Sequence, residues 1–111
     1  MKTKYTICAG MVALSASIVT SGVALAADPV RVTQQGKQFS EKNVNLSAGQ
    51  EIIFVNNDTV AHNVYTIVQG KKRDLGLQKS GEEDSITFDA AGTYRVRCAI
   101  HPKMKMVVKV D

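Results

Sequence analysis

The chain has 111 residues, a length that suits one domain and leaves little room for two. Its formal net charge is +4, and without Lys2 and Lys4, which lie in a predicted leader, the 14 basic residues become 12 against 10 acidic ones, a net +2. A balance this close to neutral, with no arginine-rich stripe, argues against nucleic acid as a partner.

The first 26 residues have the pattern of a cleaved export signal. A short basic start precedes an uncharged apolar run from Ile7 to Val19, and Ala24-Leu25-Ala26 supplies the small residues that a signal peptidase reads. We predict a signal peptide over residues 1–26, with cleavage after Ala26 or alternatively after Ala27, and one domain over residues 27–111. A membrane anchor is disfavoured, because Gly, Ser and Thr interrupt the stretch and no basic flank follows it. The sequence therefore predicts a periplasmic protein with no membrane anchor after cleavage.

The rest of the chain is predicted to be all-β. No stretch has helical apolar spacing over three turns. Short β-rich runs alternate instead with turn residues, and they cover residues 30–33, 44–46, 51–55, 62–68, 85–88, 93–98 and 104–110, with a weaker run at 75–78. In the run before Cys98, Tyr94, Val96 and Cys98 share one face. Seven to eight short strands in this length predict a Greek-key β-sandwich.

One unpaired cysteine remains in the predicted domain. Cys8 leaves with the signal peptide, so Cys98 is the single cysteine of residues 27–111. Exported proteins usually carry cysteines in pairs because their compartment is oxidising, and an unpaired one needs to be buried or occupied. A small domain without disulfides also needs another source of stability, and a bound metal is an ordinary one.

The order of the potential metal ligands indicates copper. Cys98, His101 and Met104 fall within seven residues, and His62, the other histidine, starts a predicted strand far upstream. Two imidazoles and a thiolate in a trigonal plane, with a weak axial thioether, make a type 1 copper site, which suits both Cu(I) and Cu(II). Each residue alone also fits an ordinary core or loop position. Zinc is the rival metal, but a structural zinc site takes four strong ligands, and a fourth Cys or His is missing. We predict one type 1 copper ion held by His62, Cys98, His101 and Met104.

Several short segments resemble the cupredoxins, the blue, plastocyanin-like copper proteins, from about Val30 to Val110. They are Phe54-Val55-Asn56-Asn57-Asp58, His62-Asn63-Val64, Gly92-Thr93-Tyr94 and the loop from Cys98 to Met104. The loop is most similar to that of amicyanin-like cupredoxins, including those of methylamine utilisation, and to small periplasmic cupredoxins linked to copper tolerance. The resemblance implies copper near one end of a Greek-key sandwich. It also implies that Asn63 ties the His62 loop to the Cys98 loop and so orients the ligands.

The ligand loop departs from the cupredoxin pattern in two ways. Ala99-Ile100 stands where many members have Thr-Pro or a similar pair, which should change hydrogen bonding near the sulfur. A second methionine, Met106, follows His101 by five residues, the spacing of pseudoazurin-like proteins. Met104 matches the shorter loop, so Met104 is the preferred axial ligand and Met106 is expected in the core.

The resemblance implies a one-electron carrier that exchanges electrons through an apolar patch around His101. The expected partner is a periplasmic cytochrome or dehydrogenase. Lys103 and Lys105 would rim the patch, and residues 71–73 form a second basic cluster, so acidic partner surfaces would fit. Runs of charge also simply solvate a surface, and this interpretation stays open.

The alternative function is copper tolerance, through binding or oxidation of Cu(I) in the periplasm. A dedicated copper buffer would often add Met- or His-rich stretches, and the sequence has none, which favours the carrier. An enzyme is not expected, because two histidines cannot build a second, catalytic copper centre. We expect the chain to act as a monomer.

Overall fold

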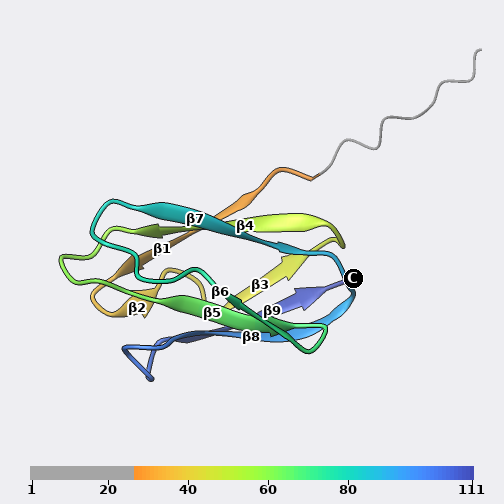
Figure 1. Ribbon diagram of the computed structural model, residues 1–111. Coiled ribbons are helices and arrows are strands. Elements are labelled where there is room, and N and C mark those ends of the chain that lie inside the picture. Colours follow the sequence, from red (N-terminus) through yellow and green to blue (C-terminus); the bar gives the residue numbers. More distant parts are fainter. Residues whose placement is uncertain (1–26) are drawn as a thin grey trace, which may run out of the picture.

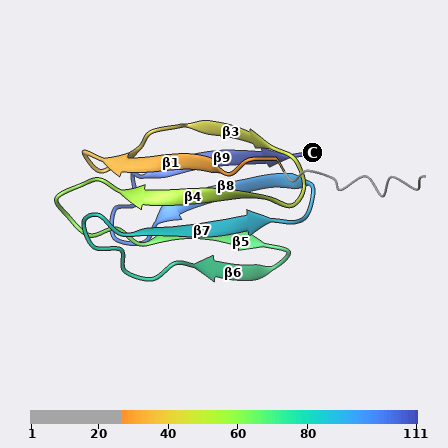
Figure 2. The ribbon, with the colours of Figure 1, turned by 90° about the horizontal axis from the view of Figure 1, so that it is seen from above.

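The computed structural model describes residues 27–111, which form a sandwich of two β-sheets (Figures 1 and 2). The predicted leader lies outside the described residues. The strands are β1 Val30–Gln35, β2 Gln38–Phe39, β3 Asn43–Leu46, β4 Gln50–Asn56, β5 Val64–Val68, β6 Lys71–Asp74, β7 Glu83–Phe88, β8 Gly92–Cys98 and β9 Lys105–Val110. One sheet has the order β2-β1-β4-β7 and the other the order β3-β9-β8-β5-β6. The predicted all-β sandwich is confirmed.

Both sheets mix parallel and antiparallel pairs. β1 runs parallel to β4, and β3 runs parallel to β9, whereas β4–β7, β5–β8 and β8–β9 are antiparallel. The parallel partners are far apart in the chain, so their pairing brings the beginning of the domain against its middle and its end. Within residues 27–111 no helix is long and apolar enough to cross a membrane.

Alternating side chains from the two sheets build the core. In β8, Tyr94, Val96 and Cys98 point inward, while Arg95 is exposed and Arg97 half-buried, as the alternation predicts. The inward residues of β9 continue this face, and Phe54 and Phe88 fill the opposite sheet. A strand with one buried face has a strongly specified register, because a slip of one residue would turn its apolar side chains to water. The core therefore fixes where β8 ends, and Cys98 is its last residue.

Two short strands were not predicted, and one predicted strand is wrong. The weaker run at 75–78 is not a strand; the partner of β5 is β6, at Lys71–Asp74. All four residues of β6 are exposed, so it carries no apolar alternation to reveal it. β2 was also missed. It pairs with β1 across the two-residue turn Gly36-Lys37, in which both residues have positive φ, 60° and 56°. Such a turn matches the twist of a hairpin.

His62 and Met104, which were predicted to begin strands, lie just before the strands instead. His62 precedes β5 and forms an isolated bridge with Gln78, and Met104 precedes β9. The connections β4–β5, β6–β7 and β8–β9 gather at one end of the sandwich, away from the C-terminus (Figure 1). This end collects segments from both sheets.

Candidate metal centre

Three potential metal ligands meet at this end of the sandwich. His62 Nδ1 lies 3.1 Å from His101 Nδ1, and Cys98 Sγ lies 3.8 Å from the first and 3.7 Å from the second. Within residues 27–111 these three side chains form the one group of at least three metal-binding residues of the His, Cys, Asp and Glu types. His62 and Cys98 are buried, whereas His101 is half-buried. The sequence prediction that these residues come together is confirmed.

Backbone hydrogen bonds hold each ligand in place. The amide of His62 donates to the carbonyl of Gln78 at 3.0 Å, and the amide of Gln78 donates back at 2.7 Å. The loop after Cys98 is closed by the amide of Met104, which donates to the carbonyl of His101 at 2.9 Å, and by the amide of Cys98, which donates to the carbonyl of Met104 at 3.3 Å. The two ligand segments are thus tied to strand ends.

The side chain of Asp58 orients the His62 ring. Its Oδ2 lies 2.9 Å from His62 Nε2. An ionised carboxylate only accepts hydrogen bonds, so Nε2 carries the proton and Nδ1 presents its lone pair to Cys98 and His101. The Lys37 amide, which donates to Oδ2 at 2.8 Å, and then the His62 ring lower the pKa of Asp58, and the Thr59 amide adds to this. Asp58 therefore stays ionised at neutral pH and selects the tautomer of His62.

A buried set of amide side chains supports the segment that carries Asp58. Asn56 Nδ2 donates to the carbonyls of Val60 and Gln78, both at 2.9 Å, and its Oδ1 accepts the Asp58 amide. Gln78 Oε1 accepts a hydrogen bond from Gln34 at 2.8 Å, and Gln78 Nε2 donates to the carbonyl of Phe54. These side chains are fully buried, so their hydrogen bonds fix the loop strongly.

Asn63 links the two ligand loops through its backbone. Its amide donates to Cys98 Sγ at 3.3 Å, and its carbonyl accepts the Ala99 amide at 2.9 Å. The side chain points elsewhere, because Asn63 Nδ2 donates to Asp74 Oδ1. This contact and the Gly76 amide lower the pKa of Asp74. The implied tie between the loops is present, but it needs no particular side chain at position 63.

The two methionines occupy different positions. Both are buried, with about 2% of their surface exposed. Met104 lies in the ligand loop and Met106 lies inside β9 opposite Val96, and both side chains belong to the core. Met104 is thus the methionine whose backbone is hydrogen-bonded to His101 and Cys98, and its role as the axial ligand stays a prediction.

The chemistry of the donors fits a copper ion. Burial, and then the neighbouring His62, lower the pKa of His101, which keeps this imidazole neutral and able to bind a metal. Two imidazole nitrogens and a sulfur face one another at close range. One proton can form a hydrogen bond between only two of these three atoms, whereas a metal ion can accept a lone pair from each of them. Two imidazoles with one thiolate suit copper, since zinc takes a closed set of four strong ligands.

Comparison with known proteins agrees with this geometry. A family model described as copper binding proteins, plastocyanin/azurin family, matches residues 26–111. Chloroplastic plastocyanin of Silene latifolia subsp. alba is 32% identical over 88% of this chain and 67% of its own. Methylamine utilization protein MauL of Methylorubrum extorquens is 29% identical over 86% of this chain and 84% of its own. A solved structure of a reduced amicyanin variant superposes with a TM-score of 0.70 at 23% identity, over 79% of this chain and 87% of its own, and shows the same fold.

The fold and the donor set define a cupredoxin. The chain belongs to the plastocyanin/azurin family of copper-binding proteins, and its fold is that of amicyanin. Copper is therefore its cofactor. Sequence reasoning missed Asp58 as a functional residue. The signal was its position four residues before His62, in a segment otherwise noted only for its resemblance to the family.

Replacing Asp58 by asparagine is expected to raise the reduction potential of the copper-loaded protein. The change removes a negative charge that favours Cu(II) over Cu(I), so the potential should rise by an amount on the order of 50 mV. Cyclic voltammetry measures it. Asp84→Asn is the matched control, because Asp84 is exposed on β7, in the opposite sheet from Cys98. Equal potentials in Asp58→Asn and the unmodified protein would contradict an electrostatic effect of Asp58 on the metal centre.

Proposed function

We propose that this protein is a periplasmic one-electron carrier whose copper is held by His62, Cys98, His101 and Met104. The observation that carries the proposal is the convergence of two imidazole nitrogens and one sulfur within 4.8 Å. Copper bound there supplies a one-electron couple between Cu(I) and Cu(II). The protein holds the ligand atoms through strand ends and buried hydrogen bonds, so little has to move when the charge changes.

His101 is the route by which an electron would enter or leave. Its ring is half-buried, whereas His62 has no exposed surface. Ile100 beside it is 47% exposed, and exposed apolar side chains also lie on the β4–β5 and β6–β7 connections, at Val60 and Leu77. Apolar side chains on the connections at one end of the sandwich suit short-lived docking of a redox partner, such as a cytochrome or a dehydrogenase.

Export is supported by the leader pattern of residues 1–26 and by the protected position of the unpaired Cys98. Cys98 is free and buried, with its sulfur facing the two imidazoles. A thiolate bound to a metal in this way is protected from unwanted pairing in an oxidising compartment. The protein would act as an electron carrier, because the donor set found within residues 27–111 fits one copper ion.

Electron exchange with a reduced c-type cytochrome tests the proposal. The copper-loaded protein should show a reversible one-electron couple and should oxidise the cytochrome rapidly in stopped-flow experiments. Ile100→Glu should slow the exchange by about tenfold, because it places a charge in the apolar contact, and should leave the potential nearly unchanged. Copper that binds but is not reversibly reduced would contradict the carrier and would favour copper tolerance.

A further inference from the structure

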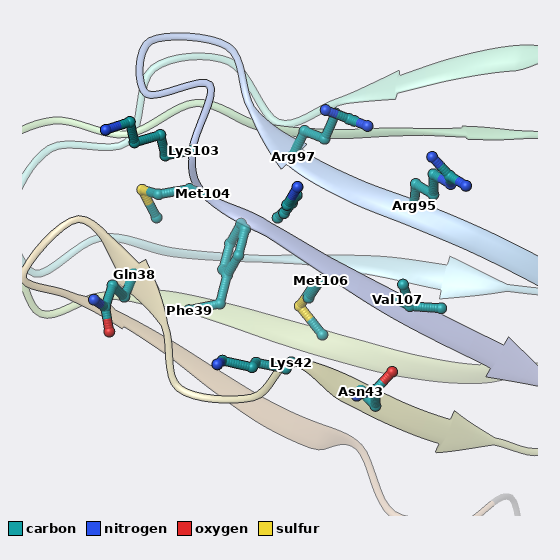
Figure 3. Close-up of a pocket in the computed structure, with 11 residues that line it drawn as sticks. Gln38, Phe39, Lys42, Asn43, Arg95, Arg97, Lys103, Met104, Met106 and Val107 are labelled. Carbon is teal, nitrogen blue, oxygen red and sulfur yellow. The ribbon is translucent and has the colours of Figure 1, made fainter.

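A groove with a strongly basic lining lies beside the candidate metal centre, where β2 of the four-stranded sheet meets β8 and β9 of the five-stranded sheet. It has a volume of about 630 Å³, and Figure 3 shows it between β2 and the strands β8 and β9. Phe39, Met104 and Met106 also line it, but all three are buried and present little apolar surface there. Its lining contains no carboxylate and five cations, namely Lys42, Arg95, Arg97, Lys103 and Lys105.

The cations of the groove are not balanced within the domain. Arg97 lies directly opposite Lys105 in the β8–β9 pair, and like charges in such cross-strand positions destabilise a sheet. Within residues 27–111 the side-chain ion pairs involve Arg31, His62 and Lys72 as cations, and none of the five groove cations. Because these like charges are unfavourable in the isolated domain, we take them as a sign of a negatively charged binding partner.

The spacing of the cations fits an extended acidic chain. Arg95 and Arg97 are two residues apart on one strand, so they point to the same side at a separation of roughly 7 Å. Carboxylates at every second residue of an extended peptide repeat at the same distance. An extended peptide can reach several of these cations at once, which a small inorganic anion cannot.

The groove is also next to the proposed copper ligands. Arg97 directly precedes Cys98, Lys103 directly precedes Met104, and Met104 itself lines the groove. A partner bound there would lie close to the metal without covering His101. Ion pairs in the groove could therefore hold the partner while the electron passes through a second contact, around His101.

From these observations we propose that the groove docks an extended acidic segment of the redox partner protein. The proposal rests on the proposed carrier function, because it names the kind of partner that this function requires. Its charges steer association and fix orientation, while the apolar contact at His101 stays available for transfer. The groove lining joins the basic rim predicted at Lys103 and Lys105 to Lys42, Arg95 and Arg97.

Titration of the ¹⁵N-labelled chain with a decapeptide of alternating glutamate and serine tests the proposal. The titration is followed by NMR, on both the metal-free and the Cu(I)-loaded protein. Amide shifts should concentrate at Lys42, Arg95 and Lys105 and should disappear at 0.5 M salt, because exposed charges are then screened. Arg97→Gln/Lys105→Gln should weaken binding about tenfold. A lysine–serine peptide of the same length should cause no shifts.

The matched control is Lys71→Gln/Arg73→Gln, which removes one Lys and one Arg from β6, at the far edge of the same sheet. It should weaken binding less than twofold. Shifts centred on β6, equal losses in the two double variants, or tighter binding to anionic vesicles or to DNA than to the peptide would overturn the proposal. Peptide binding without a reversible copper couple would refute the carrier function alone. A reversible couple without peptide binding would refute the docking groove alone.

Discussion

Replacing Cys98 by alanine is expected to abolish the strong thiolate-to-copper absorption band of the copper-loaded protein. Cys98 Sγ is the sulfur that lies 3.7–3.8 Å from both imidazole nitrogens, and its lone pairs would supply the charge-transfer transition. The visible absorption spectrum measures this. Absence of the band in the unmodified protein would overturn the assignment of a type 1 site.

The same substitution should remove most of the stability that copper confers. At a free copper concentration about 1,000 times Kd, binding adds about 4 kcal/mol to the free energy of unfolding, and a variant without the thiolate should lose most of it. Without metal, Cys98→Ala should cost only about 1 kcal/mol, since it empties a small buried volume. Chemical denaturation with and without copper separates the two effects. Equal stabilisation of variant and unmodified protein by copper would contradict Cys98 as a ligand.

Replacing Met104 by leucine is expected to raise the reduction potential by tens of millivolts or more. Leucine has a similar volume but no sulfur, so the substitution removes the thioether that we propose as the weak axial ligand, and such a ligand helps to set the potential. The thiolate band should persist, because the trigonal ligands are unchanged. Voltammetry and absorption spectra of the same samples measure both quantities.

Met106→Leu is the matched control for this experiment. Met106 is as buried as Met104 but lies within β9, opposite Val96. Its replacement should change the potential little and should cost less than about 1.5 kcal/mol of stability, as volume-conserving core exchanges do. A large shift of potential in Met106→Leu, together with none in Met104→Leu, would assign the axial position to Met106 instead.

The sequence predicted those features that follow from a single local requirement, such as the burial of one strand face or the choice of metal donors. Alternation of apolar residues predicted the inward face of β8, because a half-buried strand must separate its two faces. The softness and order of the donors predicted that His62, Cys98 and His101 come together, because few combinations of residues suit both copper states. These signals are local or compositional, so they can be recognised without knowing the pairing of strands.

The missed features depend on pairings that the sequence does not display. β6 consists of exposed polar residues that form a strand because they pair with β5. Neither strand propensity nor apolar alternation therefore predicts it from the sequence. Asp58 acquires its role because the turn at Gly36-Lys37 brings a backbone amide to it across 21 positions of the chain. Asn63 carries the expected tie through its backbone, which residue identity does not reveal.

The hydrogen bond from the Lys37 amide to Asp58 makes the geometry of the metal centre depend on both sheets of the domain. Lys37 belongs to the hairpin at the edge of the four-stranded sheet, whereas Cys98 ends a strand of the other sheet. The orientation of His62 therefore depends on contacts from both sheets. A chain in which the two sheets have not yet packed together therefore lacks the arrangement that retains copper.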